Sequence, residues 1–340
     1  LRIQNSFNLT VEYCDIDGGQ DSVLVEENAV LNWGSGNIDV DPTFVDTANG
    51  NYNLLASSQL INAGHPDSLD SDGSRADIGA YPYLNSYSGP TWYVQTDGSD
   101  TDGTGASATP FASIQSAINF ATTDGDSVTV AAGTYYEHIN TRDREIDIVG
   151  QGPGVSIIDG SSTYRTVSIN STVLFSGFTI QNGYVDRGGG MNIDAQNVSV
   201  ENCHFTNNSS SGGGDHLQLG TGGVIIKECA FTNNLSNYPI HADFGNQGGT
   251  FINCFVDANG HSVAFESNGY PSIINSTIVN YSEIAYTCHA DSDAVIINSV
   301  FYPAPGSSDT KVAGSTRDNA AIDVTVDYCI FPEEAVDFEL

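Results

Sequence analysis

The chain has 340 residues and a formal net charge of −33 at pH 7, because 42 acidic residues stand against 9 basic ones. A charge of this sign and size repels nucleic acids and anionic membrane surfaces, so neither is an expected partner. The sequence has no run of about 20 apolar residues, and insertion into a membrane is not expected. Calcium ions and cationic surfaces suit the charge better, although the same acidity also keeps an ordinary surface protein soluble.

The first part of the chain opens on strand-like residues. Residues 8–16, NLTVEYCDI, alternate apolar and polar side chains with the period of a β-strand. The chain begins at Leu1, directly before this pattern, so we expect it to be a processed or truncated part of a longer protein. A segment rich in Gly, Asp and Asn follows at 37–83, and the stretch 85–90 is predicted to be a linker.

A short amphipathic helix is predicted near 111–121. After Pro110, apolar residues recur with helical spacing at Phe111, Ile114, Ala117, Ile118 and Ala121. A strand at 128–130 follows, and we expect the helix to cover the first coil of the next structure and shield its open sheet edge. The linker therefore separates a first domain at 1–84 from a second at 91–340.

One sequence pattern recurs along the second domain. Each copy reads as a strand, a bend of one or two residues and another strand, as in VLFSGFTI (173–180), NVSVENCHFTNN (197–208), GVIIKECAFTNN (223–234), TFINCFVDAN (250–259), SIINSTIVN (272–280), AVIINSVFY (294–302) and DVTVDYCIF (323–331). The steps between the equivalent positions 178, 203, 229, 254, 276, 299 and 329 are 25, 26, 25, 22, 23 and 30 residues. This period predicts an all-β solenoid with coils of about 22–30 residues.

Stacked coils place equivalent residues above one another at a spacing of about 4.8 Å. Three cysteines then share one buried column: Cys203, Cys229 and Cys254. A disulfide between neighbouring coils is disfavoured, because the Cβ atoms of parallel strands in register lie slightly too far apart. We therefore interpret these cysteines as small apolar core residues.

A second column lies at the bend that precedes the cysteines. It consists of Asn202, Asn253, Asn275 and Asn298. Asparagine tolerates the left-handed conformation that a tight bend requires, and stacked amides are able to bond along the column. The pattern predicts a structural asparagine ladder.

These repeats resemble the pectin-lyase-like right-handed parallel β-helix superfamily, whose coils carry such a ladder. The landmarks DPTF, SSQLINAG and ADIGAY within 37–83 are similar to the closing module of extracellular β-helix proteins. The resemblance implies that 1–84 is the C-terminal end of a first β-helix and that 91–340 is a second. The ending at 332–340, PEEAVDFEL, is similar to residues that precede the sorting domain in proteins exported by the type nine secretion route. An extracellular or cell-surface location is therefore expected.

Enzymes of this superfamily place their active sites on the outer side of one sheet. Strand alternation here predicts an outer column of Asn192, His216 and His241 and, beside it, a column of Asp194, Gln218, Asp243 and Glu266. His216 and His241 with Asp194 and Asp243 are the candidate catalytic residues, since histidines beside carboxylates provide acid and base groups. Asn192, Gln218 and Glu266 are the candidate substrate-binding residues. The alternative is a polar column on a solvated sheet.

Two acidic loops are candidate calcium sites. Each contains a D-x-D-G pattern, which gathers oxygen ligands at a tight turn; the residues are Asp70, Asp72 and Asp77 in one loop and Asp97, Asp100 and Asp102 in the other. Neither loop has the spaced terminal Glu of an EF-hand, and acidic turns are also common without metal.

Two functions are compatible with these patterns. The first is a noncatalytic surface protein, a rod, coat or filament component that associates with itself or with other surface proteins. The second is a polysaccharide lyase, glycoside hydrolase or polysaccharide-binding protein that uses the His216/His241 face. The first is favoured, because the candidate face carries no Arg or Lys base and the chain lacks the GHG and RIK motifs of polygalacturonases.

Overall fold

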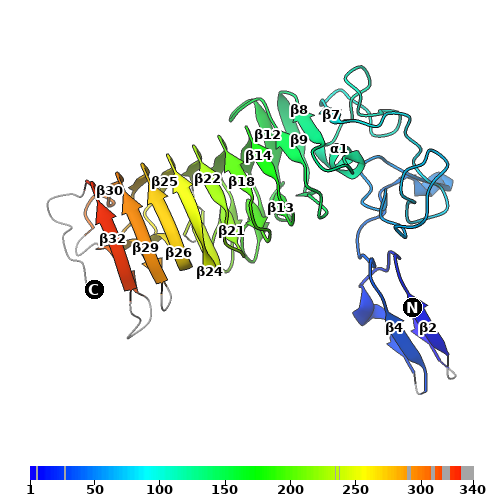
Figure 1. The fold of residues 1–340 in the computed structure, drawn as a ribbon, viewed down its shortest axis with the longest axis horizontal. Helices are drawn as coiled ribbons and strands as arrows, with labels where there is room; N and C mark the ends of the chain where they lie inside the picture. Colours follow the sequence, from blue (N-terminus) through cyan, green and yellow to red (C-terminus); the bar gives the residue numbers. More distant parts are fainter. Residues whose placement is uncertain are drawn as a thin grey trace. The chain divides into compact units, whose positions relative to one another are not determined.

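The structure is a computed structural model, and it describes residues 1–4, 7–26, 28–233, 235–236, 238–288, 292–307, 311–315 and 322–330. The chain forms two compact units, Leu1–Thr122 and Thr123–Leu340 (Figure 1). Parallel strands dominate both units, and the predicted all-β solenoid is confirmed. No helix in the described part of the chain is long and apolar enough to cross a membrane.

The first unit begins with parallel pairs of strands. β1 (Arg2–Ile3) pairs with β3 (Leu24–Val25), and β2 (Asn8–Val11) pairs with β4 (Val30–Trp33). Asn8 lies beside Val30, so the partners are 22 residues apart, as in successive coils. An antiparallel hairpin follows, made of β5 (Phe44–Asp46) and β6 (Asn51–Leu54). The 3-10 turns Gln20–Ser22 and Thr47–Asn49 and strand β7 (Thr91–Val94) complete the unit with one helix.

That helix, α1 (Ile114–Phe120), confirms the predicted element, although it begins three residues later than 111. It starts there because Ser113 is its N-cap and accepts a hydrogen bond from the Ser116 amide. Asp100 strengthens the start of the helix, since its Oδ1 accepts from the Ala112 amide (3.0 Å) and the Ser116 hydroxyl (2.8 Å). All seven helical residues are buried.

The segment after the predicted linker is bonded to the residues that precede the linker. The Asn119 amide donates to the carbonyl oxygens of Ala56 (2.9 Å) and Ser58 (2.7 Å), and the Tyr83 hydroxyl donates to Gly103 (2.8 Å). These bonds explain why the compact units divide after Thr122 and not within 85–90. The assignment of 1–84 and 91–340 to separate β-helices stays a prediction.

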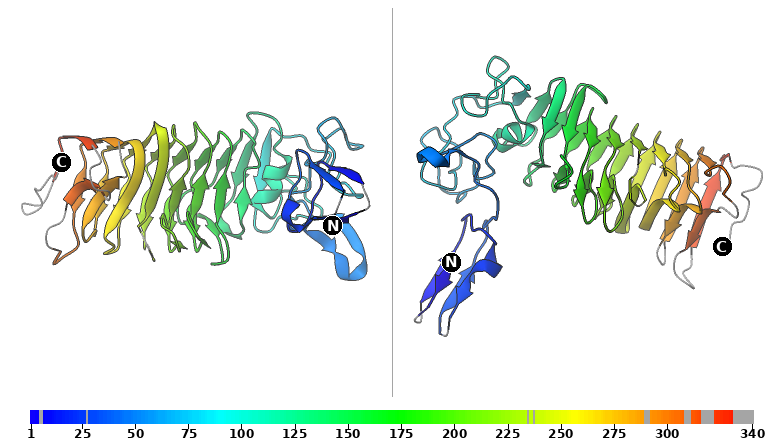
Figure 2. Two further views of the ribbon diagram at one scale, coloured as in Figure 1. Left: turned by 90° about the horizontal axis from the view of Figure 1, so that it is seen from below. Right: turned by 180° about the vertical axis from the view of Figure 1, so that it is seen from behind.

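The second unit is a stack of coils, each contributing strands to up to three parallel faces (Figures 1 and 2). The first face contains β8 (Ser127–Val130), β11 (Asp147–Val149), β14 (Leu174–Ser176), β18 (Ser199–Glu201), β22 (Ile225–Lys227), β29 (Ser292–Ile297) and β32 (Ile322–Asp327). The second face contains β9 (Gly133–Tyr136), β12 (Ser156–Asp159), β15 (Thr179–Gln181), β19 (His204–Thr206), β23 (Ala230–Thr232), β25 (Phe255–Asp257), β27 (Thr277–Val279) and β30 (Val300–Tyr302). The third face contains β10 (Ile139–Asn140), β13 (Val167–Ile169), β17 (Met191–Ile193), β21 (Leu217–Leu219), β28 (Ile284–Cys288) and β31 (Lys311–Ser315).

Two long strands connect the third face to the first. β24 (Ile240–Ile252) and β26 (Val263–Ile274) begin on the third face and end on the first, and their pairing shifts register between Asp243 and Gly248. A short pair, β16 (Tyr184–Val185) and β20 (Ser209–Ser210), lies in the turns before the third face.

The core consists of side-chain columns along the stack. Phe205 and Phe231 are Cα partners, and their rings stack with centroids 4.9 Å apart. Cys203, Cys229 and Cys254 are buried and free, which confirms the interpretation of these three as unpaired core residues. Ser276 and Ser299 continue the cysteine column, and the Ser276 hydroxyl accepts from the Cys254 amide (3.1 Å).

The bend before the cysteines has the predicted left-handed conformation. Its φ angles are 48° at Asn202, 55° at Asn253, 51° at Asn275 and 51° at Asn298, and Glu228 (56°) occupies the same position in its coil. The side chains of the four asparagines are exposed, and the coils are joined here by main-chain bonds such as Asn253 N to Ile274 O (3.0 Å). The ladder therefore acts through its backbone conformation, where stacked amides had been expected.

A second asparagine ladder follows the second face. Asn182, Asn207, Asn233 and Asn280 have φ angles of 52–58°. Here side chains do reach the preceding coil: the Asn182 amide donates to Asp159 (2.7 Å), and the Asn280 amide donates to Asp257 (2.9 Å). The repeated TNN at 206–208 and 232–234 is the sequence signal for this second bend.

Candidate functional site

The third face carries one polar outer column. Asn192 lies beside Gln218, Gln218 beside His241, and His241 beside Glu266. The flanking residues of each strand point into the core, as the full burial of Leu217 and Leu219 shows. Asn192, Gln218 and His241 are only 7–9% exposed, so the column offers little accessible surface between its neighbours.

His216 is the residue that the structure moves out of the predicted column. The sequence pattern placed it beside Asn192 and His241, whereas Gln218 occupies that position. His216 precedes β21, is fully buried and lies with its ring centroid 6.2 Å from that of Phe231. The predicted pair of external histidines is therefore wrong, because the Gly-rich turn at 211–214 shifts the alignment of the two strands by two residues.

The surroundings of His216 suppress its protonation. Burial, with a smaller contribution from the nearby His204, lowers its pKa from 6.5 to about 3. The ring nitrogen Nδ1 lies 3.1 Å from the amide nitrogen of Asn208, which is itself buried. His216 is thus a neutral core residue over the ordinary pH range.

The predicted carboxylates occupy the neighbouring column. Asp194 accepts a hydrogen bond from the Asn192 amide (2.5 Å), and the next coil places Gly220 at its level. Asp243 pairs with Asn268 in the main chain, and its side chain lies outside the described residues. Gln218 and Glu266 belong to the His241 column, two residues away from their predicted places.

Tyr238 lies near His241, and Arg187 acts electrostatically on Tyr238; the sequence pattern selected neither residue. The Tyr238 ring lies 6.0 Å from the His241 ring, and its hydroxyl donates to the Glu266 carboxylate. Burial and this carboxylate raise the Tyr238 pKa, while Arg187 acts in the opposite direction. Both residues come from turns of variable length, and no repeat marks them.

This face brings together hydrogen-bonding groups and one imidazole beside one carboxylate. Asp215 lies behind it and is fully buried, with its carboxylate bonded to the Ser210 hydroxyl (2.7 Å) and the Ser236 amide (2.8 Å). The described residues contain no group of three or more His, Cys, Asp or Glu that could hold a metal ion.

The first predicted calcium loop is organised by main-chain hydrogen bonds. Asp77 accepts from the amides of Asn62 and Tyr83 at 2.7 Å each, while Asp70 accepts from the Asp77 amide (3.0 Å). Asp72 accepts from the Asn85 amide (2.9 Å). Burial, together with the charges of Asp70 and Asp72, raises the Asp77 pKa from 3.8 to about 6.

The three aspartates of the second predicted calcium loop have different surroundings. Asp100 bonds to the start of α1, as described above, whereas Asp97 and Asp102 are exposed. Calcium binding by either loop stays a prediction.

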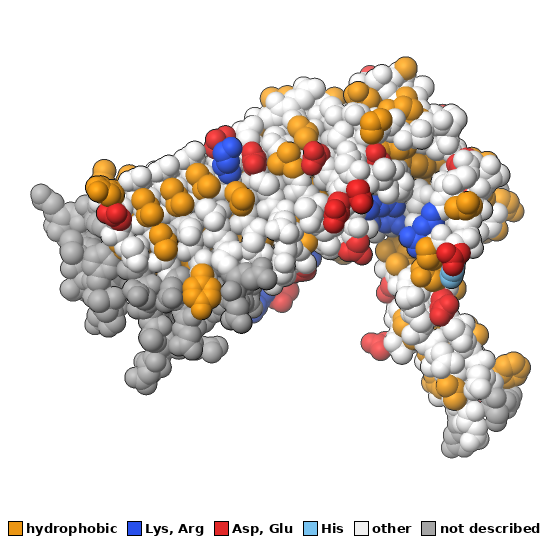
Figure 3. All heavy atoms as spheres, viewed as in Figure 1, with side chains coloured by type: hydrophobic (Ala, Val, Ile, Leu, Met, Phe, Trp, Pro, Cys, Tyr) orange, Lys and Arg blue, Asp and Glu red, His pale blue; other side chains and the backbone are white. Residues whose placement is uncertain are grey.

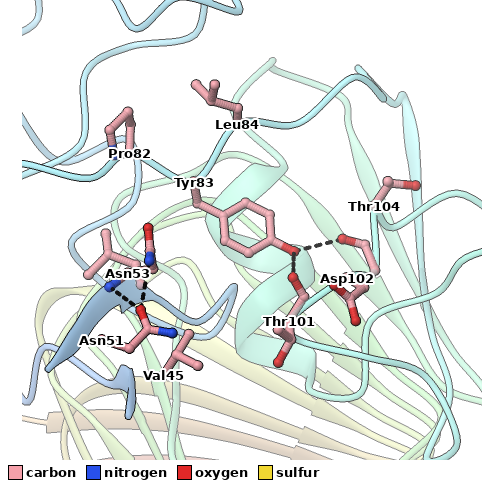
Figure 4. Close-up of a pocket in the computed structure, with 11 residues that line it drawn as sticks. Val45, Asn51, Asn53, Pro82, Tyr83, Leu84, Thr101, Asp102 and Thr104 are labelled. Atoms are coloured by element: carbon pink, nitrogen blue, oxygen red, sulfur yellow. Dashed lines mark hydrogen bonds between the residues drawn. The ribbon is translucent and has the colours of Figure 1, made fainter. Parts of the chain in front are cut away.

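A depression of about 410 Å³ lies beside Asp102, in the first unit (Figure 4). Its walls come from the β5–β6 hairpin, from 82–84 and from 101–104. The hairpin contributes Asn51 and Asn53, and the opposite side contributes Tyr83. None of these three residues was singled out from the sequence, because their approach depends on how the loops fold.

No protein-family model matches the chain, and no curated protein sequence matches it. Among solved structures, the chain is similar to a mutant pectin methylesterase crystallised in complex with a hexasaccharide. The two chains are 13% identical, the TM-score is 0.40, and the alignment covers 72% of this chain and 93% of the other.

Proposed function

We propose that this protein is a noncatalytic structural or adhesive component of an extracellular surface, and that its coils associate side by side with those of further copies. The observation that carries the proposal is an outward-facing apolar stripe on the second unit. We define the stripe as Ile252, Ile274 and Ile297 on the first face with Phe255, Val300 and Ile330 around the bend.

The stripe follows the stack. Ile252, Ile274 and Ile297 are successive Cα partners at an outward position. At the other outward position Phe255 is followed by Thr277, then by Val300 and Ile330, so one small polar residue interrupts this second column. Phe255 is 38% exposed and Ile330 is 64% exposed. Figure 3 shows hydrophobic side chains in a row along this part of the molecule. Ile252, Ile274, Ile297 and Val300 are half-buried, and such a row of partly exposed apolar side chains suits an interaction surface.

Charge distinguishes the stripe from the rest of the protein. The six side chains of the stripe carry no charge. In the isoleucine column, Lys227 precedes Ile252 and Asp327 follows Ile297. Two copies with net charges of −33 repel one another over most of their surfaces, and least where charge is absent. The most favourable contact between copies is therefore stripe against stripe.

Salt concentration gives the first test. Added salt shortens the Debye length to about 8 Å at 0.15 M, so repulsion weakens while apolar burial is retained. We expect sedimentation velocity to show monomers in dilute buffer and larger species at high sodium chloride, and electron microscopy to show laterally paired rods.

A matched pair of variants tests the surface itself. Ile274→Asp places a charge within the stripe, whereas Ser176→Asp places the same charge at the equivalent outward position of an earlier coil. The first should remain monomeric at high salt and the second should associate like the wild type. Equal association of both variants, or a wild type that stays monomeric at every salt concentration, would contradict the proposal. Calcium added in a separate arm tests the predicted metal loops.

A carbohydrate-active function is the second candidate, and the hydrogen bond between Tyr238 and Glu266 beside His241 is the observation that favours it. If this face cleaves polysaccharide, His241→Ala should abolish the release of reducing or unsaturated ends from a panel of neutral and acidic polysaccharides. His216→Ala is the less informative variant here, since His216 is buried.

A further inference from the structure

We propose that the depression in the first unit binds a neutral monosaccharide unit, either free or at the end of a polysaccharide. This site is separate from the stripe and from the His241 face, both of which belong to the second unit. Its volume of about 410 Å³ lies within the range of small-molecule sites, about 300–1000 Å³.

One wall is held in place by internal bonds. The Tyr83 hydroxyl donates to the Gly103 carbonyl (2.8 Å), as the dashed lines of Figure 4 show, and the Tyr83 ring lies 5.3 Å from that of Phe120. The 101–104 loop and Tyr83 are thus tied together before any ligand arrives. A site formed in advance loses less conformational entropy on binding.

The opposite wall presents a donor and an acceptor side by side. Asn51 Oδ1 accepts from the Asn53 main-chain amide (3.1 Å) and from Asn53 Nδ2 (2.6 Å). These bonds fix the atoms that the pair offers to a ligand, namely Nδ2 of Asn51 and Oδ1 of Asn53. A sugar hydroxyl both donates and accepts, so it complements this pair.

Apolar and acidic groups complete the match. Leu54, Val45 and Leu84 also line the depression, and Leu84 is 52% exposed. Such side chains suit the C–H face of a pyranose ring. Asp102 is exposed and provides a carboxylate acceptor for further hydroxyl groups.

The charge of the residues that line the depression disfavours anionic sugars. It contains Asp102 and no Lys or Arg, and the whole chain is strongly acidic. Uronic acids and sulfated sugars would place a second anion near Asp102 without a compensating cation. The expected ligand is therefore an uncharged sugar.

The test uses the full chain and a panel of neutral monosaccharides, neutral oligosaccharides and uronate oligosaccharides. Calorimetry and saturation-transfer NMR should detect binding of at least one neutral sugar in the millimolar range and none of the uronates. Binding of free monosaccharides as well as oligosaccharides would indicate recognition of a single unit, whereas binding of oligosaccharides alone would indicate recognition of a chain end.

Two variants and one control locate the site. Asn51→Asp keeps the oxygen that accepts from Asn53 but removes the amide donor, and Thr101→Trp fills the depression; each should weaken binding at least tenfold. Asn32→Asp makes the same change at an exposed asparagine on β4 and should leave binding unchanged. The proposal is overturned if no neutral sugar binds, or if both site variants bind as tightly as the wild type.

Discussion

Burial lowers the pKa of His216 and raises the pKa of Asp77. His216 has a pKa of about 3 in the folded chain and one near 6.5 when exposed. Asp77 has a pKa of about 6 in the folded chain and one near 3.8 when exposed. The unfolded chain therefore binds the extra proton at His216, and the folded chain binds it at Asp77.

Acidification should weaken the fold through His216. Between pH 7 and pH 5 the histidine becomes protonated in the unfolded chain but stays neutral in the folded one. This difference lowers the free energy of unfolding by about 2 kcal/mol. His216→Gln removes this titration. Urea unfolding of the second unit at both pH values should show a smaller loss in the variant than in the wild type, and equal losses would contradict the assigned burial of the ring.

Acidification should strengthen the fold around Asp77. Protonation of Asp77 stabilises the folded state; this stabilisation is complete below about pH 4 and is lost as the pH rises through about 6. Lowering the pH from 7 to 5 should therefore raise the free energy of unfolding by about 1 kcal/mol. Hydrogen exchange of the Asn62 and Tyr83 amides, which donate to Asp77, should be slower relative to intrinsic rates at pH 5. In Asp77→Asn these amides should lose that pH dependence, and a variant that retains it would show that another group is responsible.

At the scale of strands and bends, the repeat predicted the structure well where one pattern is copied from coil to coil. The positions of Cys203, Cys229 and Cys254 follow from the repeat, because the residues on either side of the bend keep the same spacing from coil to coil. The His241 column was misaligned because a turn of changing length separates the ladder from the third face. Strand alternation gives the inward and outward positions of Leu217 and Gln218, but it cannot fix how many residues a turn contains.

The buried column gives an element-scale prediction. Cys229→Ser should cost less than about 1.5 kcal/mol, because Ser276 and Ser299 already occupy the column and bond to a carbonyl two residues earlier. Phe231→Ala should cost about 3–5 kcal/mol, since it leaves a cavity against Phe205. Chemical denaturation of both variants measures the difference, and a serine variant as unstable as the alanine variant would show that the column depends on sulfur.

At the scale of the whole molecule, the two compact units predict two unfolding events. Differential scanning calorimetry should resolve a transition for Leu1–Thr122 and another for Thr123–Leu340. Since Asp77 belongs to the first and His216 to the second, His216→Gln should alter the pH response of only one transition, and Asp77→Asn that of the other. A single transition that responds to both substitutions would show that the units unfold together.

The left-handed bend has a consequence for how this surface can change. Asn202, Glu228, Asn253, Asn275 and Asn298 all take the same backbone conformation with their side chains outside the core. Residues at these corners are therefore spaced about 4.8 Å apart along the stack. Because their side chains do not pack in the core, a substitution there leaves the core packing unchanged. A binding motif at successive corners would display its groups at the strand spacing of about 4.8 Å, whereas one face of an α-helix displays them at a pitch of about 5.4 Å.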